Sequence, residues 1–128
     1  MPDDVFDIIF STKQQKIVAK LLVKEMKEHG RSLSKSEMSL FATALHEGNY
    51  IAELDEPEFA GKKVKLSYNK RQFYDRILTP LKSMGIIYYD LYKKNYSLSD
   101  QFVKDLHKIG LMWAKELDKP LGTPIKPK

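Results

Sequence analysis

The residues with the clearest chemical meaning in this sequence are positive charges gathered between positions 62 and 76. This run holds six cationic side chains against one acidic one, so its net charge of +5 equals that of the whole 128-residue chain. A field focused in this way attracts polyanions and raises their encounter rate. We therefore take nucleic acid as the first hypothesis for a partner, with a solvated lysine-rich surface as the alternative. The cationic residues are Lys62, Lys63, Lys65, Lys70, Arg71 and Arg76.

Residue types that serve catalysis and metal binding are present, but their spacing fits no site of that kind. His29, His46 and His107 are far apart, and His46-Glu47 lacks the second histidine of a zinc-protease helix. The chain has no cysteine, which excludes disulfides, thiolate zinc sites and cysteine nucleophiles. It also lacks a Walker loop, a dinucleotide fingerprint and a nucleophile elbow. We expect no enzyme activity, no cofactor and no metal site.

The positive run leads into an amphipathic helix. Ser67 or Asn69 can cap its start, and Gly85 can end it in a left-handed conformation. Pro80 predicts a kink, because the apolar spacing continues beyond it. Apolar residues recur at spacings of 4, 4 and 3, so they share one helical face. They are Phe73, Ile77, Leu81 and Met84.

A short hairpin is predicted directly after this helix. Ile86–Tyr92 is rich in β-branched and aromatic residues, Lys93-Lys94-Asn95 is a polar turn, and Tyr96–Leu98 can return as the partner strand. The tyrosines alternate between the two faces, so we expect at least one pair to pack across the strands.

Two further helices are predicted before the positive run. Ser11 or Thr12 can cap the first, which ends near His29. Its outer lysines are interpreted as a solvated face rather than a DNA contact. The second begins at Ser34, which forms an S-x-x-E capping box with Glu37; Ser36 is the rival cap. The outer lysines are Lys13, Lys16, Lys20, Lys24 and Lys27. The buried stripes are Ile17, Val18, Leu21, Leu22 and Met26, then Met38, Phe41, Ala42 and Leu45.

This order of helices, glycine and hairpin resembles the winged helix-turn-helix family of DNA-binding proteins, in its prokaryotic transcription regulators, archaeal ones included. The resemblance runs from about Thr12 to Leu98. It implies an α+β fold, mainly α, with a three-helix core and a β-hairpin wing. It also implies that the helix at about 68–84 enters the major groove while the wing at 86–98 touches the DNA backbone.

The resemblance assigns roles to individual residues. Arg71 suits a bidentate contact to guanine, and Gln72 or Asn69 suits adenine, each pair discriminating by about 1–3 kcal/mol. Lysines suit phosphates, which position the protein without reading sequence. The implied DNA-binding residues are Lys62, Lys63, Lys65, Asn69, Lys70, Arg71, Gln72, Arg76, Lys93 and Lys94.

The segment 49–66 is an insertion relative to the family pattern, whose helices are joined by about 3–4 residues. Val64, Leu66 and Tyr68 alternate with polar residues, which predicts a short extended piece. An insertion of this kind can widen the DNA contact or bind another protein through 49–61. Its acidic residues lack the spacing and glycine of an EF-hand. They are Glu53, Asp55, Glu56 and Glu58.

The two ends of the chain lie outside this core. Residues 1–11 are expected to form an arm or a short helix that docks on this subunit or on a second one, because their apolar side chains would otherwise face water. Residues 99–118 are expected to form an added C-terminal helix that pairs with a second copy, or alternatively folds back on the first helix. Residues 119–128 read as a disordered basic tail. The predicted dimer seam is Phe102, Leu106, Ile109, Trp113 and Leu117.

These observations predict a sequence-specific or general binder of double-stranded DNA, a transcription regulator acting as a homodimer. No apolar run approaches the length of a membrane span and no signal segment opens the chain, so we expect a cytoplasmic, nucleoid-associated protein without a membrane partner. The alternative is a winged helix used for protein–protein contact in a transcription, replication or chromosome-organising complex.

Overall fold

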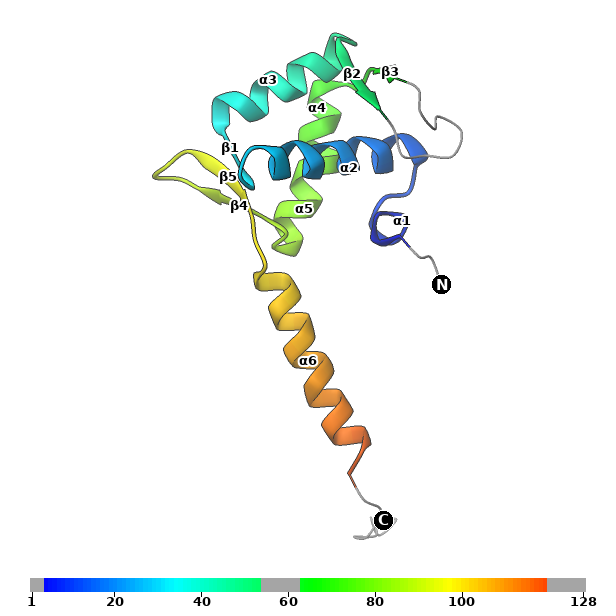
Figure 1. Ribbon diagram of the computed structural model, residues 1–128, viewed down its shortest axis with the longest axis vertical. Helices are drawn as coiled ribbons and strands as arrows, with labels where there is room; N and C mark the ends of the chain where they lie inside the picture. The colour runs from blue at the N-terminus through cyan, green and yellow to red at the C-terminus, as the bar shows by residue number, and fades with distance from the viewer. Residues whose placement is uncertain (1–3, 54–62, 120–128) are drawn as a thin grey trace.

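The structure is a computed structural model, and it describes residues 4–53 and 63–119. Within these ranges the fold is α+β and mainly helical, as predicted. A helical body carries a three-stranded and a two-stranded antiparallel sheet (Figure 1). In chain order the elements are α1 (Val5–Ile9), α2 (Lys13–Glu28), β1 (Ser32–Ser34), α3 (Lys35–His46), β2 (Tyr50–Glu53), β3 (Lys63–Leu66), α4 (Lys70–Gln72), the π-helical segment η2 (Phe73–Leu78), α5 (Thr79–Met84), β4 (Ile87–Asp90), β5 (Asn95–Leu98) and α6 (Gln101–Leu117).

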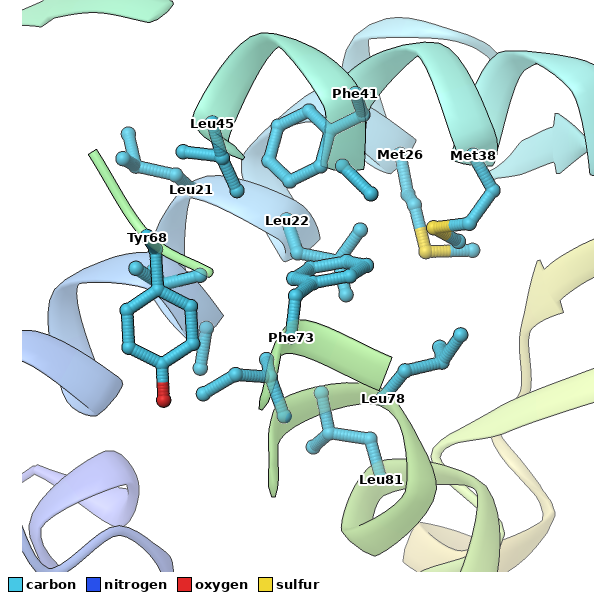
Figure 2. Packing of buried hydrophobic residues seen from close by; sticks show 14 of the residues in the cluster. Leu21, Leu22, Met26, Met38, Phe41, Leu45, Tyr68, Phe73, Leu78 and Leu81 are labelled. Atoms are coloured by element: carbon cyan, nitrogen blue, oxygen red, sulfur yellow. The ribbon is translucent and has the colours of Figure 1, made fainter. Parts of the chain in front are cut away.

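The hydrophobic core lies where α2, α3 and the continuous helix α4–η2–α5 meet. Phe73 is fully buried at its centre, with its ring 5.6 Å from that of Phe41 and with Leu22 beside it (Figure 2). Met26 and Met38 point toward one another next to this pair. Every stripe position predicted for α2 and α3 is buried, which confirms the helical periodicity. The core therefore holds the three helices in a defined relation.

Helix starts follow the capping signals of the sequence. Thr12 Oγ1 accepts the backbone N–H of Gln15 at 3.1 Å. At the start of α3, Ser34 Oγ accepts the N–H of Glu37 at 3.0 Å, and the Glu37 carboxylate accepts the N–H of Ser34 at 2.9 Å. The capping box is confirmed, and Ser34 rather than Ser36 is the cap. The hydrogen bonds from Ser34 hold the pKa of Glu37 below its usual value.

Ser34→Ala is expected to lower the free energy of unfolding by about 0.5–2 kcal/mol, measured by urea denaturation. The matched control is Ser36→Ala, at an exposed position in the same turn, with an expected effect within about 0.5 kcal/mol. Because the folded-state pKa of Glu37 is lowered, its contribution is present at neutral pH and is lost as the pH falls through that pKa. Equal losses in both variants would contradict the capping role.

The short strand β1 ties the hairpin to the helical body. It pairs antiparallel with β5, which pairs in turn with β4, so the sheet order is β1-β5-β4. Leu33 lies opposite Tyr96 in the first pair, and Tyr89 lies opposite Tyr96 in the second. The rings of Tyr89 and Tyr96 are 4.5 Å apart, which confirms the predicted packing of one tyrosine pair across the strands.

The turn of this hairpin begins earlier than the sequence pattern predicted. β4 ends at Asp90 rather than at Tyr92, and β5 begins one residue earlier than predicted, at Asn95. Asp90 Oδ1 accepts the backbone N–H groups of Tyr92 and Lys93, at 2.9 and 3.1 Å. An aspartate that bonds to the backbone of following residues favours a turn over a strand, so the ladder stops there.

Part of the insertion at 49–66 forms a second antiparallel pair of strands, β2 and β3. Tyr50 anchors this pair to the body: its ring packs edge-on against Phe41 at 5.1 Å, and its hydroxyl donates to the Glu25 carboxylate at 3.2 Å. Burial, together with the charge of Glu25, raises the pKa of Tyr50. The extended piece predicted near Val64 is thus a strand. The remaining part, 54–62, with Asp55, Glu56 and Glu58, lies outside the described residues.

The helix predicted at about 68–84 begins at Lys70, with Asn69 rather than Ser67 as its cap. It ends at Gly85, whose φ of 84° is the left-handed value that glycine adopts without strain. Leu78 is buried in addition to the predicted stripe, whereas Met84 is only half-buried. The buried face therefore shifts along the helix.

The cause of this shift is the π-helical segment before Pro80. The backbone N–H of Thr79 bonds to the carbonyl of Tyr74, five residues back, and Thr79 Oγ1 donates to the same oxygen at 2.8 Å. In a regular α-helix the Pro80 ring would crowd the carbonyl of Arg76. A wider turn immediately before the proline relieves that contact. The helix continues through Pro80, as the apolar spacing predicted.

At the N-terminal end, the short helix α1 docks on α2, as one of the two predicted alternatives. Asp4 caps α1 by accepting the N–H of Phe6 at 2.9 Å. Lys20 Nζ lies 2.6 Å from the Asp4 carboxylate, and Lys16 pairs with Asp7. Two of the lysines assigned to a solvated face thus contact α1 instead, because the acidic helix packs over that part of α2.

The C-terminal helix α6 extends away from the body (Figure 1). None of its residues is buried, so the alternative that it folds back on α2 is wrong. Its first turn is held to the body: Arg31 pairs with Asp100 at 2.8 Å, and Phe102 is half-buried. Across the described ranges, no helix has both the length and the apolar character that a membrane span requires.

Candidate nucleic-acid interface

The structure distributes the positive run over a strand and a helix rather than placing it on a single helix. Lys63 and Lys65 belong to β3, and Lys65 is exposed there. The remaining cationic residues belong to the helix that begins at Lys70. Lys62 lies outside the described residues. We call the exposed cations of these two elements, Lys65, Arg71 and Arg76, the basic surface.

Asn69 and Lys70 both have structural partners, and the sequence indicated only the capping role of Asn69. The Asn69 side chain accepts the N–H of Gln72 at 3.0 Å, so its carbonyl oxygen is engaged in capping. Lys70 Nζ donates to Ser39 Oγ at 3.2 Å and to Thr43 Oγ1 at 2.9 Å. These contacts lay the Lys70 side chain across α3, which braces the two helices against each other.

Arg71 and Arg76 are exposed cations in the first part of the helix, in α4 and η2. The Arg71 side chain is 91% exposed, and its Nε lies 3.8 Å from the carboxylate of Asp75, which is 67% exposed. A pair this exposed contributes little stability and separates readily. Gln72 is half-buried beside them. The helix therefore exposes two guanidinium groups, one of which lies close to the carboxylate of Asp75.

Lys93 and Lys94 lie in the exposed turn of the β4–β5 hairpin. Lys94 adopts a φ of 52°, a left-handed value that is uncommon outside glycine. Tyr92 is 98% exposed at the same turn and Leu91 is 76% exposed. The tip therefore combines two cations with an aromatic and an aliphatic side chain that the protein leaves uncovered.

Lys82 is a candidate contact that the sequence reasoning missed. It projects from α5, and its Nζ lies 5.7 Å from the ring centroid of Tyr89 and 5.9 Å from that of Tyr96. These cation–π contacts hold a positive charge at the junction of the helix and the hairpin. The sequence places Lys82 in the same helix as Arg71, which could have marked it as a candidate. DNA contacts, however, were predicted only for the N-terminal half of that helix.

Lys35 is a second residue that the sequence did not point to. It is the first residue of α3, and its backbone N–H donates to the carbonyl of Lys94 at 2.9 Å. This bond places the start of α3 beside the turn of the hairpin. Lys35, Lys93 and Lys94 are all exposed, so the hairpin turn and its neighbour form a second basic area.

The predicted dimer seam lies on α6. Leu106, Ile109, Trp113 and Leu117 are 52%, 49%, 61% and 76% exposed, whereas Phe102 is half-buried. These residues form no part of the basic surface.

A hollow of opposite character lies between α2, α3 and β2. Its lining includes Glu25, His29, Glu37 and Leu40, the last of which is 70% exposed. The backbone carbonyl of Glu25 bonds to His29 Nδ1 at 2.9 Å and raises the pKa of that histidine. This hollow is acidic and apolar. Within the described ranges, no three acidic or histidine side chains gather in a way that could hold a metal ion.

Arg71, Arg76 and Lys82 are all exposed on the α4–η2–α5 helix, and Lys82 lies against the tyrosine rings of the β4–β5 hairpin. Exposed guanidinium and ammonium groups of this kind can meet phosphates and base edges. Comparisons of the chain with models of protein families, with curated proteins and with solved structures found no match.

Proposed function

We propose that the protein is a winged helix protein that inserts the α4–η2–α5 helix into the major groove of double-stranded DNA. The order of elements and the sheet order β1-β5-β4 support this, because the hairpin follows the helix and pairs back to a short strand between the first two core helices. The observation that carries the proposal is the exposure of Arg71 and Arg76 on that helix. A regulator of this kind would act at the nucleoid.

In this proposal the exposed arginines read bases and the lysines hold phosphates. Arg71 and Arg76 face base edges, where arginine pairs with guanine. Lys65, Lys82, Lys93 and Lys94 meet the backbone on either side. Asn69 and Lys70 are positioning residues, since their polar atoms are already engaged within the protein.

The affinity for duplex DNA is expected to fall steeply with salt. If about four to six phosphates are neutralised, the slope of log K against log salt is about −4 to −5 per monomer. Fluorescence anisotropy with a labelled random duplex, between about 50 and 200 mM salt, measures it. An affinity that stays flat over this range would exclude the phosphate-based mechanism.

The second candidate function is a winged helix that binds another protein. The acidic, apolar hollow with the exposed Leu40 favours it, because such a surface fits a basic partner with an apolar side chain. The insertion at 49–61 could extend the same contact, although 54–62 lie outside the described residues. Failure to bind random duplex at low salt would favour this second function.

A further inference from the structure

α6 displays an apolar face that the rest of the described chain leaves uncovered. Of the fourteen large hydrophobic side chains exposed among the described residues, seven lie on this helix. Leu106, Ile109 and Trp113 follow at spacings of 3 and 4 and so form a seam along one side. A concentrated apolar face on a protruding helix marks an interaction site.

The two flanks of this seam differ in chemistry. Each flank repeats every seven residues, so its members line up beside the seam. The flank that we call smooth is apolar with a glycine at its middle: Val103, Gly110 and Leu117. The flank that we call charged has opposite charges at its two ends: Asp105 and Met112 lie on α6, and Lys119 is the second residue beyond its end.

We propose that a second copy of this chain covers the seam, with the two α6 helices antiparallel and crossing at the height of Leu111. In this register Trp113 packs against Ile109 of the partner subunit. Smooth flank meets smooth flank, so Gly110 faces its own copy and the two backbones can approach closely. Charged flank meets charged flank, which sets Asp105 opposite Lys119 of the partner subunit.

The distribution of charge selects this orientation over a parallel pair. A parallel pair opposes the charged flank to the smooth one, leaving Asp105 beside Gly110 without a cation, and it brings two Glu116 side chains together at the seam. In the antiparallel pair Glu116 lies opposite Leu106. Lys119, already 2.6 Å from Glu116 in its own helix, then lies between that carboxylate and Asp105 of the partner subunit.

The antiparallel pair also makes use of the first turn of α6. The C-terminal end of the partner helix reaches Val103, next to Phe102, which lies against Gly85 of the body. At about 1.5 Å of rise per residue, the two Asp100 residues stand about 33 Å apart at opposite ends of the pair. The inference does not rest on DNA binding, since no residue of the basic surface takes part.

Single cysteines test the orientation, because the chain has none of its own. Met112→Cys, which faces its own copy near the crossing, is expected to form disulfide-linked dimers under mild oxidation. The matched control Leu111→Cys, one residue away on the outer side, is expected to stay monomeric on a non-reducing gel. Leu106→Cys is expected to cross-link only when mixed with Glu116→Cys. Self-cross-linking of Leu106→Cys would overturn the antiparallel register.

Charge reversal gives an independent readout by sedimentation equilibrium. Asp105→Lys is expected to weaken the dimer by about tenfold, and the double variant Asp105→Lys with Lys119→Asp is expected to restore it. Trp113→Ala is expected to raise the dimer Kd about 30-fold or more, as for a central hot spot. Because α6 lies outside the core, thermal unfolding of the body is expected to be unchanged. A wild-type chain that sediments as a monomer, or a double variant as weak as Asp105→Lys, would overturn the proposal.

Discussion

Replacing both Arg71 and Arg76 by alanine is expected to weaken binding to duplex DNA by about 100-fold or more and to remove most sequence preference. Each arginine held on a guanine edge contributes about 1–3 kcal/mol of discrimination, and this variant loses two. Both side chains are exposed on the helix proposed to enter the groove. The pair between Arg71 and Asp75 opens at little cost, because both groups are well exposed.

The matched control removes the same charge from another exposed helix face. Lys24→Ala with Lys27→Ala on α2 is expected to reduce affinity only a few-fold, since charges away from the contact act through a field that salt screens over about 8–10 Å. Fluorescence anisotropy with a specific and a random duplex measures both variants. Equal losses in the two double variants would show that overall charge, and not the helix, binds the DNA.

Phe73→Ala is expected to lower the free energy of unfolding by about 3–5 kcal/mol, a large part of the stability of a small domain. The Phe73 side chain is 0% exposed and lies where three helices meet (Figure 2). Its ring contacts those of Phe41 and Tyr74 at 5.6 and 5.5 Å, so truncation leaves a cavity bordered by rigid rings. Chemical denaturation followed by circular dichroism measures the change.

The control for this prediction is Leu40→Ala. Leu40 is 70% exposed on α3, so its truncation opens no cavity and is expected to change stability by less than about 0.5 kcal/mol. A loss for Phe73→Ala no larger than that of the control would mean that the three helices do not share one core. Because the helix proposed to enter the groove packs through Phe73, a severe loss of stability is also expected to abolish the proposed DNA binding.

Much of the fold could be predicted from the sequence because it depends on interactions between residues that are close along the chain. The capping box of Ser34 and Glu37 spans three residues, and Gly85 acts at a single residue, so neighbouring letters suffice to predict both. The buried stripes of α2 and α3 follow from helical periodicity, which is also a short-range property. The early turn at Asp90 was not predicted, because the strand propensity of the following residues favoured a longer strand. The Asp90 side chain bonds to the backbone of Tyr92 and Lys93 and stabilises a turn there instead.

By itself, the sequence determined the helices, the candidates for their caps, the hairpin and the gathering of charge between residues 62 and 76. Only the tertiary structure decided that Lys70 braces α3, that Lys82 packs over Tyr89 and that Lys35 lies beside the hairpin turn. It also decided that α6 extends away from the body. The physical reason is distance along the chain. Pairings such as β1 with β5 join segments whose contact depends on how the whole core packs, and no local pattern encodes which side chains then meet.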